Sequence, residues 1–245
     1  MSDTKERKIR GSIMGYEPLV KKNPLRVLNL AGNNKKMGLI MARAGVGKTA
    51  LLVQIALDSI LRGKRVVHIS IGENLEKTKL WYDDIMEVIL QECSVANPHE
   101  LIDMVQRHRM IMSFKESAFN RARLEERLND LILQDIFKPD CVVIDGFDFT
   151  NMDHKDLEDI NNLMESLRLQ TWFSATSHRE DDRVSPSGVP APCHELDDLF
   201  ETVVLLKSDQ KNVQLEIIRH NSDACSGDTY HLSLDPATMM VKKDD

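Results

Sequence analysis

Residues 42–49 have the types and spacing of a phosphate-binding loop. They read Ala-Arg-Ala-Gly-Val-Gly-Lys-Thr, the pattern G-x-x-x-x-G-K-[S/T] with alanine in place of the first glycine. The glycines let backbone N–H groups curl around a polyphosphate, and a helix starting here would add its positive end. The lysine would reach the β- and γ-phosphates, and the threonine hydroxyl would bind Mg²⁺. The expected ligands are therefore ATP and Mg²⁺, and the expected contact residues are Ala44, Gly45, Val46, Gly47, Lys48, Thr49 and Ala50.

An acidic residue that could position the metal follows a short apolar run. Residues 141–144 read Cys-Val-Val-Ile, and Asp145 comes next. Ligands of open α/β sheets lie beyond the carboxyl ends of the strands, so this carboxylate would face the same crevice as the loop. Asp145 is therefore expected to orient Mg²⁺ through a water molecule, with Thr49 as a direct ligand. The alternative is an ordinary aspartate at the end of a strand.

Hydrolysis needs a group that polarises a water molecule, and Glu73 is the candidate. It follows the apolar run 66–71, whose carboxyl end should face the same crevice. Glu73 would orient the attacking water while Lys48 holds the phosphates, so these two are the expected catalytic residues. The alternative is that Glu73 favours the dipole of a helix that starts at Leu75. Glu76 is a second candidate.

A histidine follows another apolar run. His178 comes just after residues 171–176, again at the expected ligand end of a strand. A polar side chain at this position would sense the γ-phosphate of the nucleotide. The alternative is a structural role in the loop that begins there.

The elements that must position these residues alternate along the chain. Short apolar runs, typical of strands buried on both faces, precede stretches with apolar residues at helical spacing. Gly63 would end the first helix. This alternation predicts crossover units and a mainly parallel central sheet flanked by helices. The strands are expected at 38–42, 66–71, 107–114, 141–144 and 171–176, and the helices at 48–62, 75–91, 116–134 and 155–169.

The last part of the sequence changes character. Three runs at 202–206, 213–218 and 230–234 read as strands with no long helix between them, and Asp209–Asn212 reads as a hairpin turn. Antiparallel strands should therefore extend the C-terminal edge of the sheet. The predicted fold class is α/β, in one domain that covers residues 37–245.

Charge divides the chain into a basic arm and an acidic body. Residues 1–36 hold nine Lys or Arg and three Asp or Glu, whereas the remaining residues hold 23 and 36. Weak periodicity, together with Pro18 and Pro24, predicts an arm or linker without regular elements and with solvated lysines. Docking of this arm to a partner or to nucleic acid is the alternative.

The remaining composition limits the class of protein. The chain has 245 residues, of which 42% are hydrophobic, enough for a sizeable buried core. No apolar run approaches the roughly 18–20 residues that span a bilayer, and the first residues lack the apolar stretch of a secretory signal. The four cysteines form no C-x-x-C pair, which fits a reduced protein. We therefore expect a cytoplasmic protein with no membrane partner.

With these residues in order, the chain resembles the RecA-like ATPases, and most closely the ATPase domain of bacterial and phage replicative hexameric helicases. The circadian-clock and archaeal recombinase ATPases are nearby branches. Residues 38–70 carry most of the resemblance, and Ala42-Arg43 matches the start of the phosphate loop in the helicase group. The strand pattern of residues 197–241 agrees as well. The resemblance covers residues 37–241 and implies a RecA-like P-loop NTPase fold, ATP hydrolysis, a homo-oligomer such as a hexamer, and single-stranded DNA as a partner.

Three departures from the family pattern bear on mechanism. Residues 70–73, Ser-Ile-Gly-Glu, are one longer than the family's Ser-Leu-Glu, so Glu73 matches only with a shift, and His178 replaces a glutamine. The family's Lys-x-Arg, which reaches the γ-phosphate of the neighbouring subunit, reads Arg219-His220-Asn221 here. Arg219 would replace the lysine at the nucleotide or be a surface strand cation. Asn221 cannot act as an arginine finger.

The two loops that hold DNA in this family are acidic in this chain. Residues 146–159 contain five Asp or Glu and one Lys, and residues 178–198 also mix acidic with basic residues. Carboxylates repel the phosphate backbone, and neither loop interleaves basic and aromatic residues as single-strand channels do. The charges therefore disfavour single-stranded DNA as a partner.

The leading interpretation is a Mg²⁺-dependent, ATP-binding RecA-like protein. It would hydrolyse ATP slowly, and its nucleotide state would rearrange a loop or a subunit interface. The first alternative is a non-catalytic, ATP-gated signalling or assembly module, indicated by Asn221 and the shifted Glu73. The second is a DNA-acting motor of the helicase or recombinase type, indicated by the resemblance and the basic arm.

Overall fold

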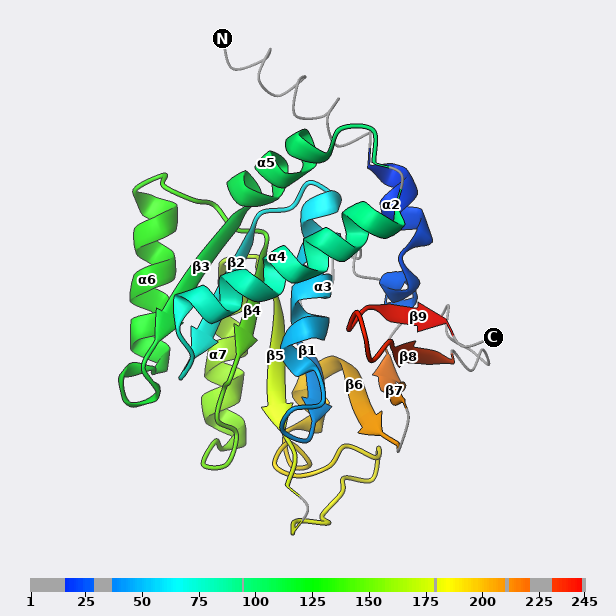
Figure 1. Ribbon diagram of the computed structural model, residues 1–245. Coiled ribbons are helices and arrows are strands. Elements are labelled where there is room, and N and C mark those ends of the chain that lie inside the picture. The colour runs from blue at the N-terminus through cyan, green and yellow to red at the C-terminus, as the bar shows by residue number, and fades with distance from the viewer. Residues whose placement is uncertain are drawn as a thin grey trace.

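One sheet organises the computed structural model, which describes residues 16–28, 37–93, 95–178, 180–209, 212–220 and 231–243. Within these residues the sheet has nine strands in the order β3-β2-β4-β5-β1-β6-β7-β8-β9 (Figure 1). The strands are β1 (Met37–Ala42), β2 (Val66–Ile71), β3 (Arg109–Phe114), β4 (Cys141–Asp145), β5 (Gln170–Thr176), β6 (Phe200–Ser208), β7 (Val213–His220), β8 (Leu232–Leu234) and β9 (Val241–Lys243).

The strands from β1 to β6 pair in parallel. β1 lies between β5 and β6, and β4 lies between β2 and β5. Every residue of β1 and β2 is buried, as expected for apolar runs that are covered on both faces. The predicted parallel sheet is confirmed. Its carboxyl ends at β1, β2, β4 and β5 lie along one edge.

The C-terminal strands reverse direction. β6 pairs with β7, β7 with β8, and β8 with β9, all antiparallel, which confirms the predicted edge of the sheet. The amide of Asp209 donates to the carbonyl of Asn212 at 2.8 Å, joining β6 and β7. β9 was not predicted. β8 begins at Leu232, and Tyr230, the predicted start, lies outside the described residues.

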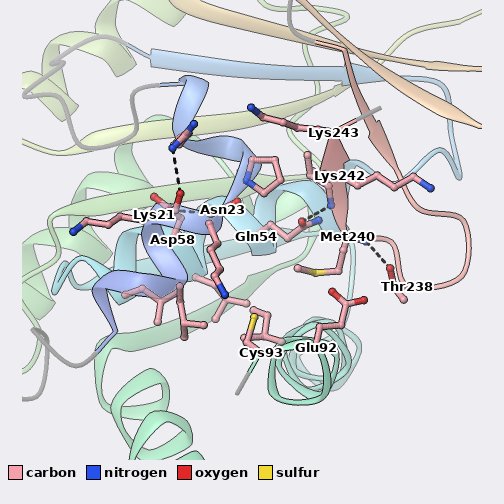
Figure 2. Close-up of a pocket in the computed structure, with 18 of the residues that line it drawn as sticks. Lys21, Asn23, Gln54, Asp58, Glu92, Cys93, Thr238, Met240, Lys242 and Lys243 are labelled. Carbon is pink, nitrogen blue, oxygen red and sulfur yellow. Dashed lines mark hydrogen bonds between the residues drawn. The ribbon is translucent and has the colours of Figure 1, made fainter. Parts of the chain in front are cut away.

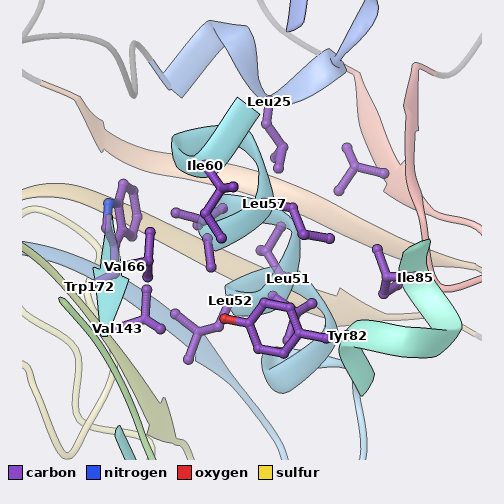
Figure 3. Close-up of a cluster of buried hydrophobic side chains, with 14 of the residues drawn as sticks. Leu25, Leu51, Leu52, Leu57, Ile60, Val66, Tyr82, Ile85, Val143 and Trp172 are labelled. Carbon is purple, nitrogen blue, oxygen red and sulfur yellow. The ribbon is translucent and has the colours of Figure 1, made fainter. Parts of the chain in front are cut away.

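Helices cover both faces of the sheet. One face carries α3 (Lys48–Leu61), α4 (Leu75–Glu92) and α5 (Pro98–His108), and the other carries α6 (Arg121–Leu133) and α7 (His154–Ser166) (Figure 1). Figure 3 shows the first of these two cores, where Leu52 of α3 lies among Val143 of β4 and Tyr82 of α4. No helix in the described part of the chain is long and apolar enough to cross a membrane.

α3 is the most deeply buried helix of its layer. All its residues from Ala50 to Leu61 are buried. It ends at Leu61, one residue before its predicted end, and Gly63 takes a φ of 83°, a left-handed conformation that costs glycine little. Since α3 begins directly after the glycine-rich loop, its burial fixes where that loop lies.

The segment before β1 differs from its prediction. It contains a short helix, α2 (Glu17–Lys22), and a 3₁₀ helix, η1 (Pro24–Leu28), so the expectation that prolines prevent regular structure was wrong. Pro18 lies in the first turn of α2, where its missing N–H is not needed. Leu25 and Leu28 of η1 are buried against the core. Residues 1–15 and 29–36 of the predicted arm lie outside the described residues.

Three other predicted elements shift their bounds. The strand expected at 107–114 begins only at Arg109, because α5 precedes it. The helix expected at 116–134 is divided into a 3₁₀ turn, η2 (Glu116–Ala118), and α6, which Asn120 caps by accepting the Arg123 amide at 2.9 Å. α7 ends at Ser166, three residues before its predicted end, and Arg168 then takes a positive φ.

Candidate functional site

The glycine-rich loop, residues 43–47, connects β1 to α3 at the carboxyl edge of the sheet. Gly45 and Gly47 have φ values of 76° and 109°, where other residues are strained. A Cβ at Gly45 would meet nothing within 4 Å, so the backbone there faces open space. A Cβ at Gly47 would lie 2.7 Å from Met239 Cε and 2.9 Å from Leu234 Cδ1. The loop therefore has one open side and one side closed by the β8–β9 segment.

Lys48 begins α3 and reaches back to the loop. Its ammonium donates to the carbonyl oxygens of Ala42 at 3.3 Å and Arg43 at 3.2 Å. Burial lowers the pKa of this ammonium, and the Asp145 carboxylate opposes that effect. The loop carbonyls thus hold the lysine charge at the segment that was predicted to bind phosphate.

Asp145 accepts hydrogen bonds from two hydroxyl groups. Thr49 Oγ1 donates to Asp145 Oδ2 at 2.6 Å across 96 positions of the sequence, and Ser174 Oγ donates to Oδ1 at 2.5 Å. The Gly146 amide donates in turn to Ser174 Oγ at 3.1 Å. A Cβ at Gly146 would lie 2.4 Å from the Ile71 carbonyl oxygen, so only glycine fits this turn. One carboxylate oxygen is therefore held by β5 and the other by α3.

These groups line a cavity of about 350 Å³ at the carboxyl edge of the sheet, called here the sheet-edge cavity. The structure brings five residues of the predicted site together around it: Lys48, Thr49, Glu73, Asp145 and His178. It is also lined by Ile71, Gly72, Glu116, Gly146, Phe147, Asp148, Phe149, Thr150, Ser174, Thr176 and Pro192.

Arg219 is not among the described residues that line this cavity. It lies on β7 opposite Val203, and its guanidinium donates to the main-chain carbonyl of Asp197 at 2.9 Å. A single chain therefore does not bring Arg219 to the other site residues. Asn221 lies outside the described residues. The remaining predicted contacts are in the loop and the first turn of α3, next in sequence to Lys48 and Thr49, and are not among the described lining residues: Ala44, Gly45, Val46, Gly47 and Ala50.

Glu73 has features of both predicted roles, the residue that orients water and the acidic residue at the start of a helix. It lines the sheet-edge cavity, yet it is half-exposed and its Oε1 accepts from Lys77 Nζ at 2.6 Å. It also directly precedes Asn74, whose side chain caps α4 by accepting the Lys77 amide at 2.8 Å. Glu76, the second candidate, is exposed, forms an ion pair with Lys79 and is not among the described lining residues.

Three lining residues were missed by the sequence reasoning. Glu116 lies close to the backbone at the end of β2, since a Cβ at Gly72 would be 2.6 Å from its Oε1. It was missed because residues 116–134 were predicted as one helix. Asp148 was counted only as loop charge, and Ser174 only as part of a strand. A polar residue inside the apolar run 171–176 was the signal that could have found Ser174.

The lining has an uneven charge. Glu73, Glu116, Asp145 and Asp148 contribute carboxylates, whereas Lys48 contributes an ammonium group and His178 an imidazole. Carboxylate and hydroxyl oxygens are ligands that Mg²⁺ prefers, and the open loop backbone with Lys48 suits an anion. The cavity therefore suits an anion bound together with a divalent cation better than an anion alone.

Comparison of the chain with models of known protein families finds no match, and comparison with curated proteins finds none either. Within the described residues, no group of three or more His, Cys, Asp or Glu side chains is arranged to hold a metal ion by itself. A metal at the sheet-edge cavity would therefore depend on a hydroxyl group, on water or on a bound anion for its remaining ligands.

Proposed function

We propose that this chain is a Mg²⁺-dependent, ATP-binding protein of the RecA-like P-loop class. It would be a slow ATP hydrolase in the cytoplasm, and its nucleotide state would rearrange a loop or the interface with another copy. The observation that carries the proposal is the 2.6 Å contact between Thr49 and Asp145 beside a glycine-rich loop with an open backbone. A lysine, a threonine and an aspartate in this arrangement suit a phosphate and its metal.

The residues fit this ligand group by group. The backbone at Gly45 faces open space, where phosphate oxygens would accept hydrogen bonds from backbone N–H groups. The Lys48 ammonium, which now donates to loop carbonyls, would donate to phosphate oxygens instead. Thr49 and Asp145 would hold Mg²⁺, with Thr49 as direct ligand and Asp145 acting through water. When bound, Mg²⁺ would neutralise phosphate charge and so offset the repulsion from the lining carboxylates.

Hydrolysis requires a carboxylate that is free to orient water. Glu73 would do this after it leaves Lys77, and its half-exposed ion pair holds it only weakly. Glu116 lines the same cavity and is the second carboxylate placed for this role. His178, exposed just after β5, would contact the γ-phosphate. Arg219 would act only on the nucleotide of a neighbouring copy.

A non-catalytic, ATP-gated module is the second candidate. Two observations favour it. The Glu73 carboxylate is paired with Lys77, and Arg219 is bonded to a main-chain carbonyl of its own chain. In this case ATP binding alone would change the loop or the interface between copies. Single-stranded DNA is the weaker partner in either case, because Asp148 adds negative charge beside the site.

Binding of ATP is the first test. Titration of the wild-type protein with ATP and Mg²⁺ should show saturable binding. Lys48→Ala should weaken it by about tenfold or more, since a hydrogen-bonded charge is lost. Lys155→Ala, on the exposed side of α7 and outside the cavity lining, is the matched control and should bind like the wild type. Equal ATP affinity in the wild type and in Lys48→Ala would reject the proposal.

Turnover separates the two candidate functions. ATP hydrolysis should be measured over a range of protein concentrations, with and without single-stranded DNA, beside the size of the protein in solution. A rate per chain that rises with oligomer formation supports the hydrolase and rejects the non-catalytic module. If Glu73→Gln lowers the rate while ATP binding persists, Glu73 orients the water. If only Glu116→Gln does so, the role belongs to Glu116. Saturable ATP binding without turnover at any concentration supports the module.

A further inference from the structure

A second and larger cavity lies against α3, beside α2 and η1. Its volume is about 670 Å³, within the range of sites for small organic ligands. We call it the α2–α4 cavity, because its walls come from α2 and η1, from α3, from the end of α4 and from the β8–β9 segment (Figure 2). Its apolar lining consists of Leu19, Pro24, Leu57, Leu61, Ile89, Met240 and Val241.

Charged side chains ring this apolar lining. Five are cationic, Lys21, Lys22, Arg26, Lys242 and Lys243, and three are acidic, Asp58, Glu92 and Asp235. Arg62 pairs with the buried Asp58, and Lys242 pairs with Asp235. Within the described residues, Lys22 and Lys243 pair with no acidic side chain. The lining is thus basic in a chain whose formal net charge is −7.

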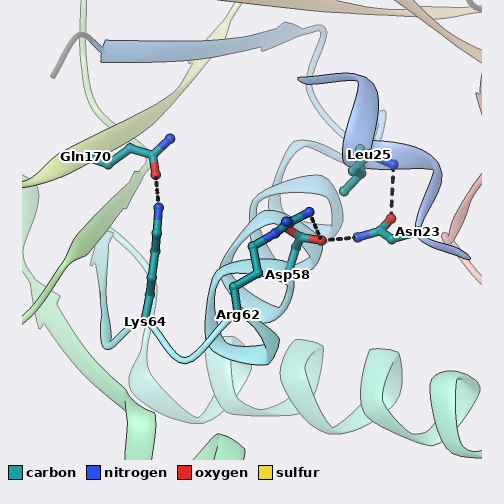
Figure 4. A network of polar contacts seen from close by, with 6 residues as sticks. All are labelled: Asn23, Leu25, Asp58, Arg62, Lys64 and Gln170. Atoms are coloured by element: carbon teal, nitrogen blue, oxygen red, sulfur yellow. Dashed lines mark hydrogen bonds and ion pairs between the residues drawn. The ribbon is translucent and has the colours of Figure 1, made fainter. Parts of the chain in front are cut away.

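One wall of the α2–α4 cavity is fixed to α3 by buried polar contacts. Asp58 is fully buried and accepts from Asn23 Nδ2 at 2.8 Å and from Arg62 Nε at 2.6 Å (Figure 4). Asn23 Oδ1 also accepts the Leu25 amide at 3.0 Å. This network holds the corner between α2 and η1 against α3.

The opposite wall is fixed by Gln54 of α3. Its side-chain amide donates to the Met239 carbonyl at 2.8 Å, and its Oε1 accepts the Val241 amide at 2.8 Å. Both walls are therefore attached to the same helix. A cavity held in this way is formed before any ligand arrives, so little ordering of the protein would oppose binding.

From this arrangement we infer that the α2–α4 cavity binds a small amphiphilic anion. An aliphatic body would lie on the leucine, isoleucine and methionine side chains, and a carboxylate or phosphate head would meet cationic side chains of the lining, Lys22 and Lys243 among them. None of the described lining residues is aromatic, so the cavity offers no surface on which a nucleotide base would stack. An aliphatic anion free in solution is the ligand whose chemistry matches both parts of the lining.

Cys93 provides a direct reporter of occupancy. It lines the cavity and is partly exposed, whereas Cys141 and Cys193 are buried. The test uses full-length protein with Cys225→Ser, since Cys225 lies outside the described residues. Alkylation of Cys93 by uncharged iodoacetamide is followed in the absence of nucleotide. Decyl phosphate or decanoate, each below its critical micelle concentration, should slow this alkylation in a saturable manner. Inorganic phosphate should not slow it, and decanol should protect more weakly than either anion.

Charge variants locate the head group. Lys22→Glu with Lys243→Glu should raise the concentration of decyl phosphate for half protection by about tenfold or more, because two cations at the head are reversed. Lys155→Glu, far from the cavity lining, should leave it unchanged. Equal protection by decanol, an equal effect of Lys155→Glu, or protection only by phosphatidylglycerol vesicles would overturn the proposal. In Lys48→Ala, decyl phosphate should protect Cys93 at the same concentration as in the wild type. This outcome would separate the α2–α4 cavity from ATP binding.

Discussion

At the scale of single residues, Ser174 decides how Asp145 is held. Its hydroxyl donates to Asp145 Oδ1 and accepts the Gly146 amide, and the residue is almost fully buried. Ser174→Ala would leave one carboxylate oxygen and one amide without these partners. The carboxylate that should position Mg²⁺ would then be less well oriented.

We expect Ser174→Ala to weaken ATP binding by about tenfold when Mg²⁺ is present, since a hydrogen bond to a charged group is lost. Binding in the presence of a chelator should change little. Calorimetric titration under both conditions measures the difference. Ser166→Ala is the control, because the Ser166 hydroxyl donates to the Leu163 carbonyl near the end of α7, away from the residues that line the sheet-edge cavity. An equal loss with and without Mg²⁺ would show that Ser174 acts on folding of the loop rather than on the metal.

His68 makes stability depend on pH. It is buried in β2, its Nδ1 lies 3.0 Å from the Tyr82 hydroxyl, and its Nε2 has no hydrogen-bond partner among the residues that the structure describes. Burial lowers the pKa of His68 to about 4, the Asp145 carboxylate opposes this, and the Arg109 guanidinium adds to it. In the unfolded chain the pKa returns to about 6.5, so between these values the unfolded state binds a proton that the folded state does not.

The free energy of unfolding should therefore fall as the pH falls from about 6.5 to about 4, by up to about 3 kcal/mol. Urea unfolding at a series of pH values measures this slope. His68→Gln should remove that part of the slope, because glutamine does not titrate. His99→Gln, exposed on α5, should keep it. If wild type and His68→Gln show the same pH profile, His68 is not the residue responsible.

At the scale of elements, burial explains which parts of the fold could be predicted from the sequence. β1, β2 and β4 are apolar runs because both faces are covered, so composition alone locates them. α2, η1 and β9 have six residues or fewer, too few for a periodic pattern. Their place depends on contacts with distant residues, as when Leu25 packs against α3.

The same distinction holds for the candidate site. Lys48 and Thr49 follow from a local motif, and Asp145 from its place at the end of a strand. Ser174 is marked only as a polar residue in an apolar run, and its pairing with Asp145 depends on the register of β4 against β5. Glu116 depends on where η2 brings the chain after β3. The local sequence does not show which side chains meet through strand register or through a turn.

Gln54 connects the helix after the glycine-rich loop to the C-terminal strands. Its amide bonds to Ala50, Met239 and Val241 in a nearly buried position. Gln54→Leu keeps the size of the side chain but leaves buried backbone groups unpaired. We expect it to lower the free energy of unfolding by about 2–4 kcal/mol, measured by urea denaturation. Gln106→Leu on the exposed side of α5 should cost far less. A loss of similar size in both variants would contradict this role of Gln54.

At the scale of the whole molecule, the segment from Asp235 to Val241 lies between the glycine-rich loop and the α2–α4 cavity. Met239 contacts the loop, since its Cε would be 2.7 Å from a Cβ at Gly47. The neighbouring Thr238 and Met240 line the α2–α4 cavity (Figure 2). A ligand that orders Met240 would therefore also hold Met239 against Gly47, and so favour the loop conformation that suits phosphate.

If both proposed ligands bind, their affinities should be coupled. Saturating decyl phosphate should raise the affinity for ATP by about fivefold or more, and ATP should raise the affinity for decyl phosphate by the same factor. Each ligand is titrated with and without a saturating concentration of the other, which measures the two factors. The factors must agree because binding free energies form a closed cycle. Lys22→Glu with Lys243→Glu should abolish the effect of decyl phosphate while keeping ATP binding. An ATP affinity that is the same with and without decyl phosphate would show that the two cavities are independent.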